Sequence, residues 1–321
     1  MLATVRGSQQ PRRRSTGSSL SVCVVTVAIG LIFHGCSSSH ERPGPAAPAA
    51  TAPGPSGGQD DNVDDKIDTT PPGAPPPSGP IGTDGNHGIR VFDEAKKELG
   101  RIYAAAGQRT DLYCGCSFLV EPGHGMRVDL AGCGYVVAKD RARAERIEWE
   151  HAVPASAFGH TFAEWREGSP KCVDGHGKKF HGRKCARLAS AEFARIEADL
   201  HNLFPVVGEV NGLRSDFPMG VLDAGRTPRD AAHDAASSFH FGACQSAIEH
   251  GVFLPRREVR GDLARAYKYM NRSYPERHLI DDAHRVVFDA WDTGDPPDAW
   301  ERERNVRIAA KQGNANGFIG D

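Results

Sequence analysis

Two short segments near the middle of the chain carry side chains that could hydrolyse a phosphodiester. Residues 146–155 read Arg-Ile-Glu-Trp-Glu-His-Ala-Val-Pro-Ala and place Glu150 beside His151. Residues 199–214 contain Asn202 and Asn211. A neutral histidine can take a proton from water near pH 7. A carboxylate and a carboxamide can hold a hard cation such as Mg²⁺, which keeps several of its waters. These groups together predict a metal-dependent nuclease.

The first segment has the alternation of a half-buried strand, with Ile147 and Trp149 on one side and the two glutamates on the other. Successive side chains of a strand point to opposite faces. Glu150 and His151 can therefore share one site only if the chain bends at His151. Pro154 follows closely and favours such a break.

The asparagines must come from a second element. Asn211 can complete the site if it lies on a helix packed over this strand. Taken alone, a Glu-His pair is commonly a surface pair, and Asn202 alone is more often a cap or turn residue. The prediction therefore depends on their combination.

The N-terminal residues 1–35 are predicted to be a signal peptide. Arg12, Arg13 and Arg14 precede a 14-residue, almost entirely apolar run at 20–33, which is shorter than the roughly 20 residues of a membrane-spanning helix. Cys36 follows the run and predicts lipidation, although His34 is unusual for a lipoprotein signal. The alternative is an ordinary cleaved signal with an incidental cysteine.

Residues 37–87 are rich in Pro, Gly, Ala and Asp and predict a disordered linker, because they hold few large apolar residues to bury. Residues 88–321 form one domain's worth of sequence. That segment has 33 basic and 34 acidic residues, so net charge gives no nucleic-acid signal. The best basic candidate is the helical pattern at 256–272, which suits phosphate binding or a core helix with a solvated rim equally well.

The cysteines indicate an oxidising compartment. Six remain besides Cys23 and Cys36, an even number behind a signal peptide. They are Cys114, Cys116, Cys133, Cys172, Cys185 and Cys244. Six cysteines allow 15 pairings, of which Cys172 with Cys185 is favoured by the short, Gly-rich segment between them. The alternative is a zinc knuckle formed by these two cysteines with His176 and His181.

The pattern of the domain predicts a helix-rich α+β fold. We expect helices at 94–106, 190–203, 256–274 and 280–291, and strands at 112–120, 132–138 and 146–151.

Several motifs, in the same order along the chain as in that family, resemble the bacterial endonuclease I family. This family belongs to the ββα-metal, or His-Me finger, nuclease superfamily. The resemblance covers most of 88–321. The motifs are Tyr113-Cys-Gly-Cys116, Cys133-Gly-Tyr, residues 146–155, Gly182-Arg-Lys184 with Cys185, Asp199-Leu-His-Asn-Leu203, Gly208-Glu-Val-Asn-Gly212, Arg260-Gly with Ala264-Arg-Ala-Tyr267, and Glu303-Arg304 with Arg307-Ile-Ala309.

The resemblance implies a disulfide-stabilised ββα-metal core and a role for each motif residue. It implies that His151 is the general base, that Glu150 and Asn211 ligate one Mg²⁺, and that Mn²⁺ or Ca²⁺ can substitute. Arg183 would hold the scissile phosphate. Asn202 would orient the site by fixing the loop after His151.

The resemblance also implies partners and a location. It predicts a monomer that cuts DNA and RNA with little sequence preference and leaves 5′ phosphates. Taken with the N-terminal residues, it predicts a protein that is secreted, or an outer-membrane or periplasmic lipoprotein tethered through Cys36; the N-terminal tether itself is not a feature of the family. The segments around 176–181 and 221–240 are longer than the family pattern predicts and could alter substrate access.

Two other functions are compatible with parts of the sequence. One is a tethered nucleic-acid-binding lipoprotein with weak or no activity, which the intact candidate residues disfavour. The other is a zinc hydrolase using His160, His176 or His181, although no His-Glu-x-x-His pattern is present.

Overall fold

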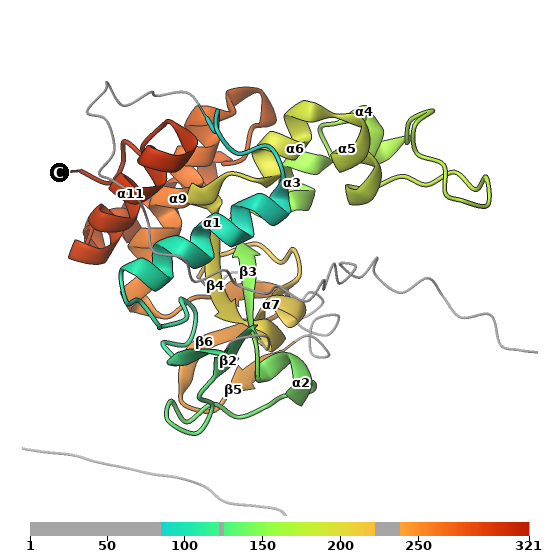
Figure 1. Ribbon diagram of the computed structural model, residues 1–321. Coiled ribbons are helices and arrows are strands. Elements are labelled where there is room, and N and C mark those ends of the chain that lie inside the picture. Colours follow the sequence, from blue (N-terminus) through green and yellow to red (C-terminus); the bar gives the residue numbers. More distant parts are fainter. Residues whose placement is uncertain (1–84, 122–124, 222–237, 321) are drawn as a thin grey trace, which may run out of the picture. The chain divides into compact units, whose positions relative to one another are not determined.

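Short antiparallel strands and helices alternate along the part of the chain that the computed structural model describes, residues 85–121, 125–221 and 238–320 (Figure 1). The predicted signal peptide at 1–35, Cys36 and nearly all of the 37–87 linker lie outside these residues. Among the described helices, none is both long and apolar enough to cross a membrane.

The described strands form three small antiparallel sheets. The first pairs β1 (Phe118–Glu121) with β2 (Gly125–Val128). The second pairs β3 (Ile147–His151) with β4 (Leu203–Val207). The third contains β5 (Phe239–Phe241), β6 (Cys244–Glu249) and β7 (Val252–Leu254).

Helices lie between the strands along the chain and make the domain helix-rich, as predicted. They are α1 (Phe92–Ala105), α2 (Arg141–Ala144), α3 (Ala155–Gly159), α4 (Ala163–Arg166), α5 (Arg183–Ala189), α6 (Ala191–Glu197), α7 (Gly208–Arg214), α9 (Arg260–Ser273), α10 (Asp282–Gly294) and α11 (Ala299–Gln312). The 3₁₀ turns are η1 (Leu200–Asn202), η3 (Arg257–Val259) and η4 (Pro275–Arg277). The predicted helices at 94–106, 256–274 and 280–291 correspond to α1, α9 and α10.

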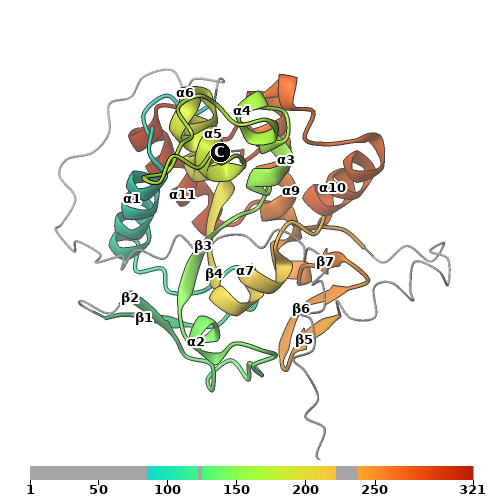
Figure 2. The ribbon, with the colours of Figure 1, turned by 90° about the vertical axis from the view of Figure 1, so that its right-hand side faces the viewer.

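The β3–β4 pair connects the two ends of the fold. In Figures 1 and 2 these strands run from the group of helices α3 to α6 toward the small sheets formed by β1–β2 and β5–β7. Every residue of β4 is buried, and the core continues through Phe158, Phe193 and Leu263. Four of the five residues of β3 are buried as well, so this strand, which carries the candidate site residues, is held by packing.

Two of the predicted strands differ from the structure: the one at 112–120 begins later than predicted, and 132–138 is not a strand. In the region of 112–120 only Phe118 onward is a strand, and 132–138 contributes a single bridge, from Tyr135 to Gly242. The Asp111 carboxylate accepts the backbone N–H groups of Cys114 and Cys116, which turns the chain there. The aromatic and apolar residues in these segments indicated burial, and turns bury them equally well.

The predicted helix at 190–203 ends early. It stops at Glu197 and is followed by η1 and then by β4, which the sequence pattern did not predict. Pro205 in β4 argues against a central strand, since proline cannot donate to a ladder. Pro205 is tolerated here because, among the described strands, β4 pairs with β3 alone. The Pro205 carbonyl accepts the N–H of Leu112 at 2.8 Å.

The basic helix α9 uses two of its cations inside the domain. Arg265 is fully buried and pairs with Glu301 and Asp292. Lys268 pairs with Asp289 at 2.7 Å and with Asp292 at 2.8 Å. The sequence pattern at 256–272 suited either phosphate binding or a core helix. For Arg265 and Lys268, the structure agrees with the core helix.

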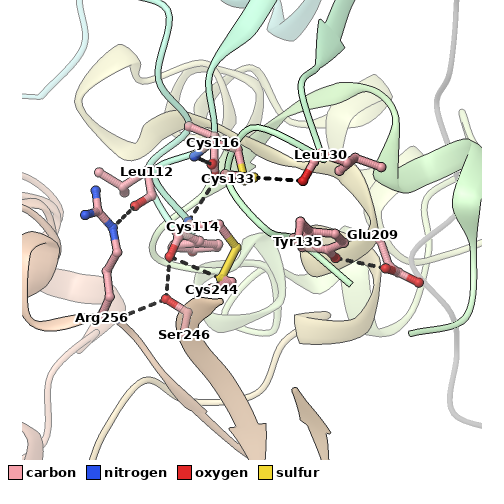
Figure 3. Close-up of a disulfide and its surroundings, with 12 residues drawn as sticks. Leu112, Cys114, Cys116, Leu130, Cys133, Tyr135, Glu209, Cys244, Ser246 and Arg256 are labelled. Atoms are coloured by element: carbon pink, nitrogen blue, oxygen red, sulfur yellow. Dashed lines mark hydrogen bonds between the residues drawn. A yellow bond between two sulfur atoms is a disulfide. The ribbon is translucent and has the colours of Figure 1, made fainter. Parts of the chain in front are cut away.

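Three disulfides join the six cysteines of the domain: Cys114–Cys244, Cys116–Cys133 and Cys172–Cys185. Figure 3 shows the first of them beside Ser246, whose hydroxyl donates to the Tyr113 carbonyl at 2.6 Å. The Cys172–Cys185 pairing is the one predicted. It also rules out the zinc knuckle, because both sulfur atoms are bonded to each other.

We predict that the disulfides differ in their contribution to stability. In the chain-entropy description a bridge stabilises by about 5 kcal/mol for the 130-residue separation of Cys114–Cys244 and by about 3 kcal/mol for the 13-residue separation of Cys172–Cys185. Replacing each pair by serine should lower the free energy of unfolding in this order in guanidinium titrations. A larger loss from the Cys172–Cys185 replacement would contradict the prediction.

Candidate active site

The centre of the candidate site is a unit of two strands and one helix. Strand β3 pairs with β4 so that His151 faces Leu203, and α7 begins directly after β4. Gly208 and Gly212 let α7 approach closely. A Cβ at Gly208 would lie 2.8 Å from a Glu148 carboxylate oxygen, and one at Gly212 would lie 2.1 Å from the Arg143 guanidinium. At Gly208 a Cβ would also lie 2.7 Å from the Arg143 backbone carbonyl oxygen, which cannot easily move, so glycine there lets α7 lie close to α2.

Two carboxylates of β3 and their hydrogen-bond partners from α7 lie on one face of this unit. Glu148 and Glu150 are two residues apart in β3, and Asn211 and Arg214 are three apart in α7. Asn211 Nδ2 donates to Glu148 Oε2 at 2.8 Å. Glu148 also pairs with Arg143, so its charge is compensated inside the protein. The side-chain oxygen Oδ1 of Asn211 has no hydrogen-bond partner among the described residues.

Arg214 joins the end of β3 to α7. Its buried guanidinium donates to Glu150 Oε1 at 2.7 Å and to the backbone carbonyls of His151 and Ala152 at 2.8 and 2.9 Å. The Tyr113 hydroxyl approaches the same Glu150 oxygen at 3.4 Å. Burial raises the pKa of Glu150 above its ordinary value, and the positive charge of Arg214 opposes that rise.

His151 lies on the opposite face and is held by its surroundings. Its ring stacks on Phe92 with centroids 5.1 Å apart and lies 6.4 Å from Phe158. Nε2 is 2.8 Å from the Glu197 carbonyl oxygen. A carbonyl can only accept, so Nε2 carries the proton and Nδ1 keeps the free lone pair of a base. Burial, aided by the charge of Arg183, lowers the pKa of His151 to about 3, and the imidazole is neutral at physiological pH.

Asn202 fixes the chain just after His151. The Val153 N–H donates to its Oδ1 at 2.8 Å, and its Nδ2 donates to the Val153 carbonyl at 3.0 Å. The side chain is fully buried. It therefore orders the backbone beside the histidine and does not face a substrate.

Arg183 and Arg187 share the buried carboxylate of Glu197, with Arg183 Nε 2.5 Å from Oε1 and Arg187 Nε 2.6 Å from Oε2. Burial alone would raise the pKa of Glu197, but the two arginines lower it below its usual value. Both guanidinium groups also lie over the Phe92 ring. The Arg183 side chain is 32% exposed, and its buried Nη2 has no hydrogen-bond partner within the described residues.

The structure groups the predicted residues on two faces. His151 and Arg183 meet around Phe92 and Glu197, while Glu150 and Asn211 both lie on the α7 side of β3. The bend expected at His151 comes directly after it, at Ala152 and Val153. His151 still pairs with Leu203, and the chain turns only after it, because Arg214 and Asn202 hold Ala152 and Val153.

Sequence reasoning missed several residues that build the site. Glu148 was noted only as a partner in the strand alternation, yet it contacts Asn211 directly. Arg214 had one available signal, its spacing of three from Asn211 on a helix. Phe92 and Glu197 gave no local signal, since they reach His151 from distant segments.

The donor set suits a hard cation that keeps most of its waters. Glu150 and Asn211 offer oxygen atoms from adjacent elements, which is what Mg²⁺ prefers. Within the described residues no three His, Cys, Asp or Glu side chains are grouped as a metal cage. A zinc site of three or four protein ligands therefore does not fit these residues, whereas a cation with one or two protein ligands does.

The β3–β4–α7 unit is a ββα core within an α+β nuclease fold. The Endonuclease I family profile matches residues 92–321. The chain is 39% identical over 234 residues to an extracellular deoxyribonuclease of Aeromonas hydrophila, covering 72% of this chain and 88% of that protein. A periplasmic deoxyribonuclease of the same organism is 39% identical over 233 residues, covering 72% and 85%. Endonuclease-1 of Buchnera aphidicola subsp. Acyrthosiphon pisum is 35% identical over 209 residues, covering 64% and 72%.

The chain belongs to the Endonuclease I family and is a nuclease. Relatives named extracellular and periplasmic, together with three disulfides, support export.

We predict that Asn202 and Asn211 differ sharply in their structural roles. Asn202→Ala leaves two buried backbone groups of Val153 without partners, at about 1–3 kcal/mol each, and should lower the free energy of unfolding by about 2–4 kcal/mol in urea titrations. Asn211→Ala removes one partly exposed hydrogen bond and should cost about 1 kcal/mol or less. Equal losses would show that Val153 is held by other groups.

Proposed function

We propose that the protein is an exported, Mg²⁺-dependent endonuclease that hydrolyses phosphodiester bonds of DNA and RNA with His151 as the general base. The observation that carries the proposal is the histidine itself. Its Nε2 is fixed on the Glu197 carbonyl, its Nδ1 is free to accept a proton, and Arg183 lies close enough to influence its charge.

His151 Nδ1 takes the proton from the attacking water. The strand and the Phe92 ring hold the imidazole in one orientation, so little ordering is needed when the substrate arrives. A neutral histidine is the form required, and burial keeps it neutral.

Arg183 binds the scissile phosphate. Its Nε donates to Glu197, while the exposed part of the guanidinium, on a side chain that is 32% exposed, would donate to a non-bridging phosphate oxygen. A guanidinium suits this task because it stays charged and presents donors in a fixed plane. It would stabilise the charge that develops as the water attacks.

Glu150 and Asn211 would hold one Mg²⁺ through oxygen atoms, with Mn²⁺ or Ca²⁺ as substitutes. When bound, such a cation neutralises charge on the phosphate and on the departing 3′ oxygen. Arg214 keeps the Glu150 carboxylate in place for this role.

The proposed reaction is a hydrolysis with water as the nucleophile. The water oxygen bonds to phosphorus while the bond from phosphorus to the 3′ oxygen breaks. His151 receives one proton of the water, and the 3′ oxygen takes a proton from solvent. The products are a 5′ phosphate and a 3′ hydroxyl.

The substrate is proposed from the relatives and from the chemistry of the site. Three of the relatives are named for deoxyribonuclease activity, which supports DNA. Contacts made to phosphates carry no direct sequence information, so we propose little sequence preference and activity on RNA as well. We propose a monomer, with the tether through Cys36 as the membrane attachment.

We expect His151→Ala to lower the rate of plasmid nicking by about 10²–10⁴-fold, the usual contribution of general base catalysis. The exposed His240→Ala serves as the control and should cut like the wild type. DNA binding in chelator should persist in both variants. Near wild-type turnover by His151→Ala would remove this residue from the mechanism, and an inactive wild type would favour the alternative of a binding lipoprotein.

A further inference from the structure

A basic hairpin projects beside Arg183 and is not used by the site described above. It spans residues 172–182, between α4 and α5, and Figure 1 shows it extending away from these helices. We call it the basic arm. It coincides with the segment near 176–181 that is longer than the family pattern predicts.

The basic arm is a built hairpin. The Asp174 carboxylate accepts the N–H groups of His176 and Lys178, both at 2.9 Å. Val173 and Lys179 form an antiparallel bridge across it. Gly177 has φ of +80°, which favours glycine at the tip. The only acidic residue of the arm is thus occupied in forming its turn.

Both ends of the arm are bonded to residues near the candidate site. The Cys172–Cys185 disulfide joins its first strand to α5, and the Gly182 N–H donates to the Trp165 carbonyl at 2.9 Å. Arg183 follows Gly182 directly. The two ends of the arm are therefore held close to Arg183, the proposed phosphate ligand.

The charge of this region differs from that of the whole domain. Residues 171–187 contain six Lys or Arg residues and one acidic residue, Asp174, whereas 88–321 is balanced. Lys171, Lys178 and Lys179 are exposed, and none of the three takes part in an ion pair with another described residue. Such unpaired cations attract a polyanion.

We propose that the basic arm binds the phosphate backbone of the nucleic acid several nucleotides away from the bond that is cut. This inference rests on the proposed function. From Cys172 to the tip at Gly177 the arm can reach about 16 Å at about 3.3 Å per residue. That distance corresponds to about five base pairs at roughly 3.4 Å each. Lys178 and Lys179 lie at the tip and would make the outermost contacts.

The test compares Lys178→Gln/Lys179→Gln with the wild type in the full chain. Binding to a duplex of about 30 base pairs, measured in chelator against salt concentration, should show a log–log slope smaller by about 2, or about 1 for each lysine. The kcat/KM for this duplex should fall several-fold. The kcat/KM for a tetranucleotide, which is too short to reach the arm, should stay within about twofold.

The matched control is Arg302→Gln/Lys311→Gln, which removes two exposed charges from α11. It should leave the salt slope and both kcat/KM values unchanged. An equal effect in the control, an unchanged slope in the arm variant, or a fall in tetranucleotide cleavage would each overturn the proposal. If the arm variant lost binding to anionic lipid vesicles alone, the arm would be a membrane contact and the proposal would also fail. A wild type that cuts neither substrate would instead contradict the proposed function.

Discussion

The buried guanidinium of Arg214 is the interaction on which the candidate site depends. It joins α7 to β3 by binding the Glu150 carboxylate and the carbonyls of His151 and Ala152 at once. Removing one partner of a buried ion pair typically costs about 3–5 kcal/mol, because a charge is left without compensation. The position of the helix, the carboxylate and the histidine backbone is thus set by one side chain, and the close approach at Gly208 and Gly212 makes that contact possible.

The extended conformation of β3 divides the chemistry between two faces. The oxygen donors lie toward α7, and His151 lies toward Phe92, Glu197 and Arg183. A phosphodiester at the end of the strand would meet both faces. Asn202 supports this division by holding Val153, so that the turn after the histidine is fixed. The long segment between β3 and β4 contains Arg183, the proposed phosphate ligand, and the disulfide Cys172–Cys185 lies next to it.

The sequence predicted the parts of the site that are local in the chain. The strand at 147–151, the helical spacing within α9 and α10 and the Cys172–Cys185 pair each follow from short-range patterns, and the structure confirms them. The strand is buried on more than the one face that its alternation predicted, since Glu150 is buried. The sequence did not predict β4, because a proline such as Pro205 argues against a paired strand. It also did not predict the turns near 112–117 and 132–138, where disulfides and backbone hydrogen bonds determine the conformation of the chain. Phe92 and Glu197 could not be found from spacing, since packing alone brings them to His151.

The central claim is that Glu150 and Asn211 hold the catalytic cation. The most direct measurement is the Mg²⁺ concentration needed for half-maximal plasmid cleavage in the wild type, in Glu150→Ala and in Asn211→Ala. The account predicts that both variants need substantially more Mg²⁺ and that chelator abolishes cleavage in all three until Mg²⁺ is added back. Cleavage in chelator, or a Mg²⁺ titration unchanged in both variants, would contradict it.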